Sequence, residues 1–218
     1  MLEAPVFQDK FHRYKKNIGI AVLVILHVVG LVGLLLDEYR ESFLALSAVN
    51  LSISFIILII TRNKQTVGFY LFMVFAFFVG MTVEWIGVHS GLLFGDYYYG
   101  ESLGFKWYGV PLIIGVNWVM LTIISAAVAK RLRLNTYLQA LVAAFLMLVL
   151  DILIEPVAIV SDYWYWSGDI PLSNFVTWFI VALFLQLIWF HFKLAEKNKV
   201  AFSLYCIQVT FFIILNSF

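Results

Sequence analysis

Long apolar runs separated by short polar connections dominate this chain. Seven of these runs reach about 18 residues or more, the length at which a helix crosses a hydrocarbon core of ~30 Å. They cover residues 18–36, 43–61, 67–89, 109–129, 137–160, 174–192 and 200–217. The pattern predicts an all-α polytopic membrane protein with seven transmembrane helices, in which residues 1–218 form one integral membrane domain.

Composition supports this prediction and narrows the class of partner. Of the 218 residues, 63% are hydrophobic and only 12% are charged, which lies outside the usual range of soluble domains. A net charge of +1 gives no reason to expect a nucleic acid partner. The chain has one cysteine, Cys206, and neither zinc-ligand spacing nor a glycine-rich phosphate loop, so we expect no metal and no cofactor.

Basic residues predict the orientation, because Lys and Arg are retained in cytoplasmic loops. If the N-terminus is inside, only Arg40 and Lys106 of the fourteen basic residues fall outside. We therefore expect an N-in, C-out topology. The first apolar run has no small-residue cleavage site behind it, which favours an anchor over a removable signal.

Two loops on the outer side resemble each other, one with Asp96 before three tyrosines and one with Asp162 before Tyr-Trp-Tyr-Trp. The helix after each loop begins with Pro-Leu and has a tryptophan seven residues beyond the proline, at Trp118 and Trp178. We interpret this as a parallel repeat, in which helices 3 and 4 are repeated as helices 5 and 6.

Three carboxylates, Glu84, Asp151 and Glu155, lie inside predicted spans that contain no Lys or Arg. Asp151 and Glu155 share one helix face, where two negative charges would repel each other in a poor solvent for charge. We expect at least one to be protonated at neutral pH, and hence able to act as a general acid on a lipid-soluble substrate. A structural alternative is that they hydrogen-bond to Asn117, Ser161 or backbone freed by Pro156, where we expect a kink or break.

Aromatic and polar residues near these carboxylates are candidate substrate-binding groups. The aromatic side chains could stabilise a carbocation through their π faces, or could form an ordinary interfacial belt. His89 could relay protons, and the two asparagines could orient water. The candidates are Trp85, His89, Tyr97, Tyr99, Asn117, Trp118, Trp164, Trp166, Asn174 and Trp178.

The ordered set of motifs over about residues 84–178 resembles the carotenoid biosynthesis proteins that include the carotenoid 1,2-hydratases. It comprises Glu84-x-x-Gly87, Gly91-x-x-Phe94-Gly95-Asp96-Tyr97-x-Tyr99, Gly109-Val110-Pro111 with Asn117-Trp118, Asp151-x-x-x-Glu155-Pro156, Tyr163-Trp164-x-Trp166, and Ile170-Pro171-Leu172-Ser173-Asn174-Phe175-x-x-Trp178. In the family, Asp-Pro more often stands where this chain has Glu155-Pro156, and a Gln usually stands at Val157.

The resemblance implies addition of water to the terminal double bond of an acyclic carotenoid, with the bilayer as the source of substrate. Asp151 or Glu155 would donate the proton and Glu84 would position or deprotonate water, in the outer half of a prokaryotic cytoplasmic membrane. A carotenoid cyclase would form the same cation and quench it by ring closure. A proton-coupled transporter is a further alternative, although the acids cluster in the outer half instead of following a path across the membrane.

Overall fold

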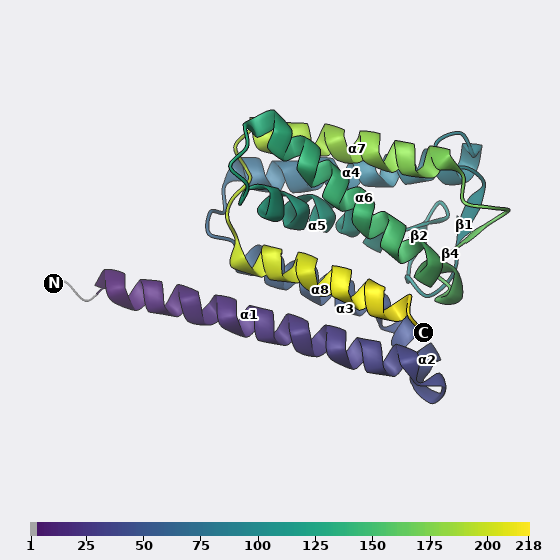
Figure 1. Ribbon diagram of the computed structural model, residues 1–218, viewed down its shortest axis with the longest axis horizontal. Helices are drawn as coiled ribbons and strands as arrows, with labels where there is room; N and C mark the ends of the chain where they lie inside the picture. The colour runs from purple at the N-terminus through teal and green to yellow at the C-terminus, as the bar shows by residue number, and fades with distance from the viewer. Residues whose placement is uncertain (1–3) are drawn as a thin grey trace.

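The computed structural model describes the backbone of residues 4–218 and side chains from Arg13 onward, and this part of the chain is almost entirely helical. Its helices, labelled in Figure 1, are α1 Ala4–Leu35, α2 Asp37–Ala45, α3 Ser47–Ile60, α4 Val67–Ser90, α5 Leu112–Ala129, α6 Thr136–Val160, α7 Leu172–His191 and α8 Lys199–Leu215. Four short strands connect them: β1 Tyr97–Tyr99, β2 Lys106–Trp107, β3 Val110–Pro111 and β4 Trp164–Trp166.

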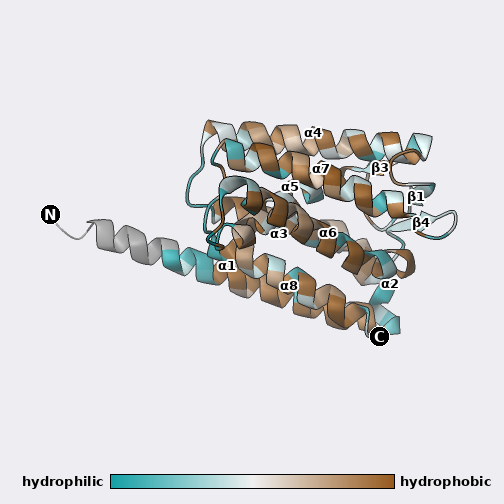
Figure 2. Ribbon diagram, turned by 45° about the horizontal axis from the view of Figure 1, so that its top comes forward, coloured by the Kyte–Doolittle hydropathy of each residue, from teal (hydrophilic) through white to brown (hydrophobic). Residues whose placement is uncertain are grey.

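Five helices, α1 and α4 to α7, are long and apolar enough to cross a membrane, and the bent pair of α2 and α3 makes a sixth if it counts as one span. α8 is apolar but shorter, at 17 residues. Figure 2 shows hydrophobic residues along the helices and hydrophilic residues mainly at their ends and in α2. The described chain is therefore a helical protein with five to six apolar helices that are able to span a membrane.

Polar side chains fix where three of these helices begin. Thr66, Asn135 and Asn198 each accept a hydrogen bond from a backbone N–H in the first turn of α4, α6 and α8 respectively. Such caps satisfy donors that have no partner within the helix. The apolar runs and these caps together explain why α4, α6 and α8 begin close to the predicted starts at 67, 137 and 200.

The structure differs in detail from two local predictions. The run at 43–61 is not one straight helix, because the chain bends by 55° between α2 and α3, around Leu46. Pro156 does not break its helix, since α6 continues to Val160. A proline removes one backbone donor, and here the neighbouring hydrogen bonds and packing are sufficient to keep the helix continuous.

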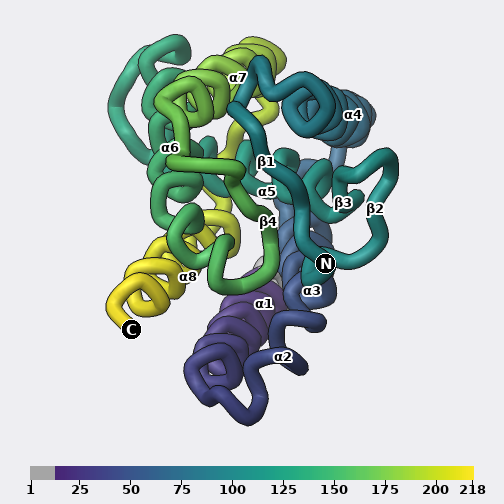
Figure 3. The backbone as a smooth tube through the Cα atoms, turned by 90° about the vertical axis from the view of Figure 1, so that its right-hand side faces the viewer, coloured from purple at the N-terminus to yellow at the C-terminus, as the bar shows by residue number. Residues whose placement is uncertain are grey.

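α5 lies at the centre of the molecule, packed against α3, α4, α6, α7 and α8. α1 packs on α2, α3 and α8 along the border of this bundle, as the end-on view of Figure 3 shows. The core is continuous, with Trp118, Trp189, Phe69 and Met120 among its largest buried side chains. The helices enclose a space that is lined by residues of α1, α3 and α8 as well as of α4 to α7.

The two aromatic loops noted in the sequence pair with each other. β1 and β4 run antiparallel, with Tyr97 opposite Trp166, Tyr98 opposite Tyr165 and Tyr99 opposite Trp164. β2 and β3 form a separate small hairpin. Both pairs lie at the end of the molecule where α4 and α6 finish (Figure 1), so this sheet closes one end of the enclosed space.

Candidate active site

A cavity of about 290 Å³ occupies the space beneath the β1–β4 pair. All eight helices contribute to its wall, together with the two aromatic strands. The cavity brings together most of the residues singled out in the sequence. These are Glu84, Tyr97, Tyr99, Asn117, Asp151, Glu155, Trp164, Trp166, Asn174 and Trp178.

Glu84, which is 3% exposed, is held by three donors. The hydroxyls of Tyr97 and Tyr99 donate to Oε2 at 2.6 and 2.8 Å, and Nε1 of Trp118 donates to Oε1 at 3.0 Å. Burial, and then the neighbouring Glu84 carboxyl, raises the pKa of both phenols, so they remain protonated donors. Trp118 thus does not line the cavity but orients a carboxyl group that does.

Gly87 explains how Tyr97 reaches Glu84. A Cβ atom at this position would lie 2.9 Å from the Tyr97 hydroxyl and 2.4 Å from the Phe94 ring. Both are closer than real Cβ atoms approach other heavy atoms. The glycine one turn after Glu84 therefore makes room for the phenol beside the carboxyl group.

Glu155 is also held by three donors, but all three are nitrogens. Nε1 of Trp164 and Nε1 of Trp166 donate to Oε2 at 3.1 and 3.0 Å, and Nδ2 of Asn174 donates to Oε1 at 3.1 Å. An indole or amide N–H can only donate, so the partner must accept at both oxygens. This arrangement suits an ionised carboxylate.

Asp151 differs from both, because neither carboxyl oxygen has a hydrogen-bond partner although the residue is only 2% exposed. It lies one turn before Glu155 on α6, in the cavity wall. The alternative in which Asp151 hydrogen-bonds to Asn117 or Ser161 is not what the structure shows. Within the described part of the chain the only carboxylate–cation pair is Lys106 with Glu101, so no basic side chain neutralises these acids.

Two predicted substrate-binding residues lie elsewhere. Trp85 is 43% exposed, and His89 contacts it through an Nδ1 hydrogen bond of 2.9 Å to the Trp85 carbonyl oxygen. Neither residue lines the cavity. The reason is helix geometry, since residues one and five positions after Glu84 project from other faces of α4.

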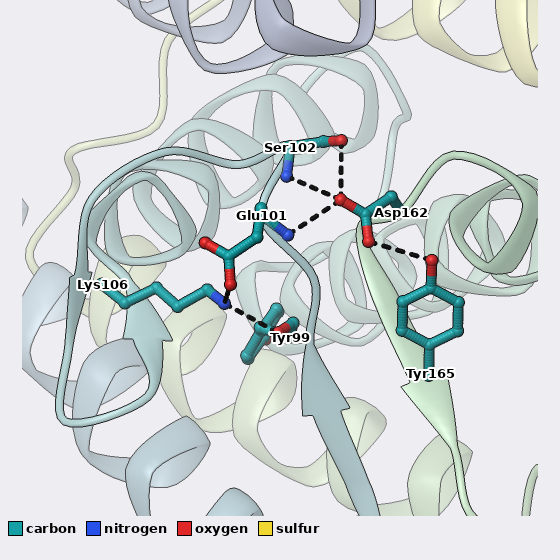
Figure 4. A network of polar contacts seen from close by, with 6 residues as sticks. All are labelled: Tyr99, Glu101, Ser102, Lys106, Asp162 and Tyr165. Carbon is teal, nitrogen blue, oxygen red and sulfur yellow. Dashed lines mark hydrogen bonds and ion pairs between the residues drawn. The ribbon is translucent and has the colours of Figure 1, made fainter. Parts of the chain in front are cut away.

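A set of contacts around the β1–β4 pair, here called the loop clasp, holds the aromatic strands in place (Figure 4). The Asp162 carboxylate accepts hydrogen bonds from the backbone N–H groups of Glu101 and Ser102, and from the Ser102 and Tyr165 hydroxyls. Burial opposes ionisation of Asp162, but these four hydrogen bonds outweigh it and lower its pKa. Lys106 Nζ completes the clasp by donating to the Tyr99 carbonyl oxygen at 2.9 Å and to Glu101 at 2.7 Å.

Comparison with known proteins identifies the family of this chain. The sequence matches the carotenoid biosynthesis protein family over residues 43–218. The chain belongs to this family. No curated protein and no solved structure gives a significant match. In this carotenoid biosynthesis protein, the matched region contains all the predicted site residues, whereas α1 precedes it.

Sequence reasoning missed the cavity residues contributed by α1, α3 and α8. Among them are five polar side chains, His27, Ser47, Asn50, Ser54 and Gln208. Each stands inside an apolar helix, where a polar group is costly unless it has a function or a partner. Polar residues inside apolar helices could therefore have indicated these cavity residues, but the family motifs cover only residues 84–178.

Proposed function

We propose that this carotenoid biosynthesis protein hydrates the terminal carbon–carbon double bond of an acyclic carotenoid end group. The observation that carries the proposal is the position of Asp151. Its unpartnered carboxyl group lies in the wall of a largely apolar cavity, next to two carboxyl groups whose hydrogen bonds are already supplied. An acid without an internal acceptor is available to protonate an apolar substrate.

The reaction balances without an added reagent. The proton on Asp151 bonds to the less substituted alkene carbon, leaving a carboxylate and a tertiary cation on the adjacent carbon. A water oxygen then bonds to that carbon and gives a proton to Glu155 or Glu84. Transfer of this proton back to Asp151 restores the starting state, and the product is a tertiary alcohol.

The cavity wall suits the intermediate. Trp164, Trp166 and Trp178 line it and present aromatic surface, which attracts cations through the ring quadrupole. The Glu155 carboxylate lies among the same side chains and adds a negative charge in a site of low dielectric constant. Asn117 lines the cavity without a side-chain hydrogen bond in the described chain, so its amide can orient water.

Size and exposure indicate how the substrate binds. A volume of about 290 Å³ is at the small end of ligand pockets, which fits an end group and not a whole carotenoid. Val29, Leu46 and Val49 line the cavity and are still 51%, 49% and 49% exposed. In a bilayer these residues face acyl chains, so the opening between α1 and α3 gives lateral access from the membrane.

The topology that goes with this proposal has seven spans, with α2 and α3 counted as one and α8 as the last. The N-terminus is inside and the C-terminus outside a prokaryotic cytoplasmic membrane, which places the cavity in the outer half. Pairing of β1 with β4 and contact between Trp118 and Trp178, the equivalent tryptophans, support the parallel repeat.

Expression in a lycopene-accumulating host, followed by mass analysis of the pigments, tests the function. A hydratase yields pigment that has gained one or two molecules of water. A pigment of unchanged mass with a changed absorption spectrum would instead indicate the cyclase, and unmodified lycopene beside membrane-inserted protein would contradict both activities.

A further inference from the structure

The cavity has a second polar region, remote in sequence from the three carboxylates. His27 of α1, Asn50 and Ser54 of α3, and Gln208 of α8 all line it. His27, Ser54 and Gln208 are only 8%, 1% and 7% exposed. Because these residues lie within apolar helices, their polar atoms need partners from one another or from a ligand.

Contacts between the three helices bring these side chains together. A Cβ atom added to Gly30 of α1 would lie 3.6 Å from Nδ2 of Asn50 and 4.0 Å from the Phe211 ring. The same Phe211 ring packs edge-on against His27 at 5.6 Å between centroids. Phe211 lies one turn after Gln208 on α8, so the three polar groups line the part of the cavity where α1, α3 and α8 meet.

The hydrogen bonds within this polar region show which of its donors and acceptors still have no partner. His27 Nδ1 lies 2.8 Å from the Leu23 carbonyl oxygen, which can only accept, so Nδ1 carries a proton and Nε2 of the neutral ring is an acceptor. Ser54 donates to Oδ1 of Asn50 at 3.3 Å, which leaves the Asn50 amide N–H groups to donate. Oε1 of Gln208 is buried without any partner.

This set of free atoms contains two acceptors, His27 Nε2 and Gln208 Oε1, and the amide donors of Asn50 and Gln208, with no charged side chain among them. It matches a small neutral ligand that both donates and accepts hydrogen bonds, namely a hydroxyl group. Water is the hydroxyl compound that hydration consumes, and buried water typically makes about three hydrogen bonds to such groups. Neither a cation nor an anion would be matched by this set.

We propose that His27, Asn50 and Gln208 form a hydroxyl subsite that binds the water consumed in the reaction. The inference rests on the proposed hydration and deepens it, because it assigns a position to the second substrate. The subsite belongs to α1, α3 and α8, whereas the acids belong to α4 and α6, and both groups line the same cavity. The same atoms could instead hold the hydroxyl group of an isoprenoid alcohol, and the second experiment below separates the two ligands.

The first experiment measures how the carbocation intermediate divides between capture by water and loss of a proton or ring closure. Gln208→Leu and His27→Leu are expected to lower the ratio of hydrated pigment to products that lose a proton or close a ring by about tenfold, the effect of one hydrogen bond of ordinary net strength. His191→Leu, at the exposed end of α7, is the matched control and keeps the wild-type ratio. A purely structural role would lower all products together, and an unchanged ratio overturns the assignment.

The second experiment does not depend on turnover. Hydroxyl-radical footprinting of the full chain in nanodiscs detects water beside buried side chains. We expect labelling of His27 and Phe211 in the wild type, and loss of Phe211 labelling in Gln208→Leu. Absence of labelling at both residues in the wild type overturns the subsite.

Addition of farnesol or of farnesene, a hydrocarbon with the same isoprenoid skeleton, identifies the occupant. Equal protection of Phe211 by both compounds supports water as the ligand, whereas protection by farnesol alone assigns the subsite to a substrate hydroxyl group and overturns water. If footprinting succeeds while the lycopene host forms no hydrated pigment, the subsite stands and the proposed hydration fails.

Discussion

The indole rings of Trp118 and Trp178 stack with their centroids 4.0 Å apart and their planes inclined by 13°. Trp118 stands on α5 and donates to Glu84, while Trp178 stands on α7 and lines the cavity. The stack therefore links the support of one carboxyl group to the wall that faces the substrate.

Substitution of each tryptophan by phenylalanine separates these two contributions. Trp118→Phe removes part of the stack and the N–H donor to Glu84, so we expect a destabilisation of about 2–4 kcal/mol. Trp178→Phe removes only stacking area and is expected to cost about 1 kcal/mol. Thermal unfolding in nanodiscs measures both values. Equal losses would show that the hydrogen bond to Glu84 contributes little.

Asp151→Asn is expected to reduce hydration by about 10²–10⁴-fold, the usual range for loss of a general acid. The amide is similar in size, so the protein should still accumulate in membranes. Asp169→Asn, in the exposed loop before α7, is the matched control and should leave pigment conversion unchanged. Hydrated pigment at wild-type levels in Asp151→Asn would remove the acid role.

The two glutamates should respond differently to replacement by glutamine. At Glu155 all three partners are obligate N–H donors, so a glutamine NH₂ group must face another donor, and we expect a loss of about 1–3 kcal/mol. At Glu84 the phenols of Tyr97 and Tyr99 can rotate and accept from the amide. Glu84→Gln should therefore unfold close to the wild-type temperature, and the reverse order of stabilities would contradict these hydrogen-bond assignments.

Asp162 predicts an acid sensitivity of the loop clasp. Because its pKa is lower in the folded protein than the ordinary value of 3.8, the clasp is stabilised above that value and loses this contribution as the pH falls below it. We expect faster hydrogen exchange of the Glu101 and Ser102 amides as the pH is lowered, after correction for intrinsic exchange. In Asp162→Asn the corrected exchange should be fast and should no longer depend on pH in this range.

Cysteine labelling tests the orientation of the fold. Tyr98 is 57% exposed on β1, and Arg133 lies in the loop at the opposite end of the bundle. In a Cys206→Ser background, Tyr98→Cys should react with an impermeant thiol reagent added to intact cells. Arg133→Cys should react only after lysis, and the opposite result would invert the proposed topology.

Apolar runs predicted most of the fold, because the length of a span and the polar caps at its ends are both local properties. The bend at Leu46 depends on how α2 packs against α1. No residue between 43 and 61 predicts it. Pro156 is the opposite case. A proline inside a helix favours a break, but the surrounding contacts of α6 keep the helix continuous.

The sequence predicted the candidate-site residues that lie on the cavity-facing side of their helices. Glu84, Asp151 and Glu155 stand out because carboxyl groups are rare in apolar helices. Trp85 and His89 were chosen for proximity in sequence to Glu84, and a helix directs such neighbours to other faces. The pairing of β1 with β4 is a long-range contact, so the sequence could not show that Trp164 and Trp166 both bind Glu155.

The opening beside Val29 and Val49 has a bearing on any assay of this protein. On the proposed lateral route the pigment is never dissolved in water, so its effective concentration is its mole fraction among the surrounding lipids. Detergent would dilute the pigment and place competing hydrocarbon chains at the same opening. Turnover should consequently scale with pigment per lipid and remain unchanged when the total volume is altered.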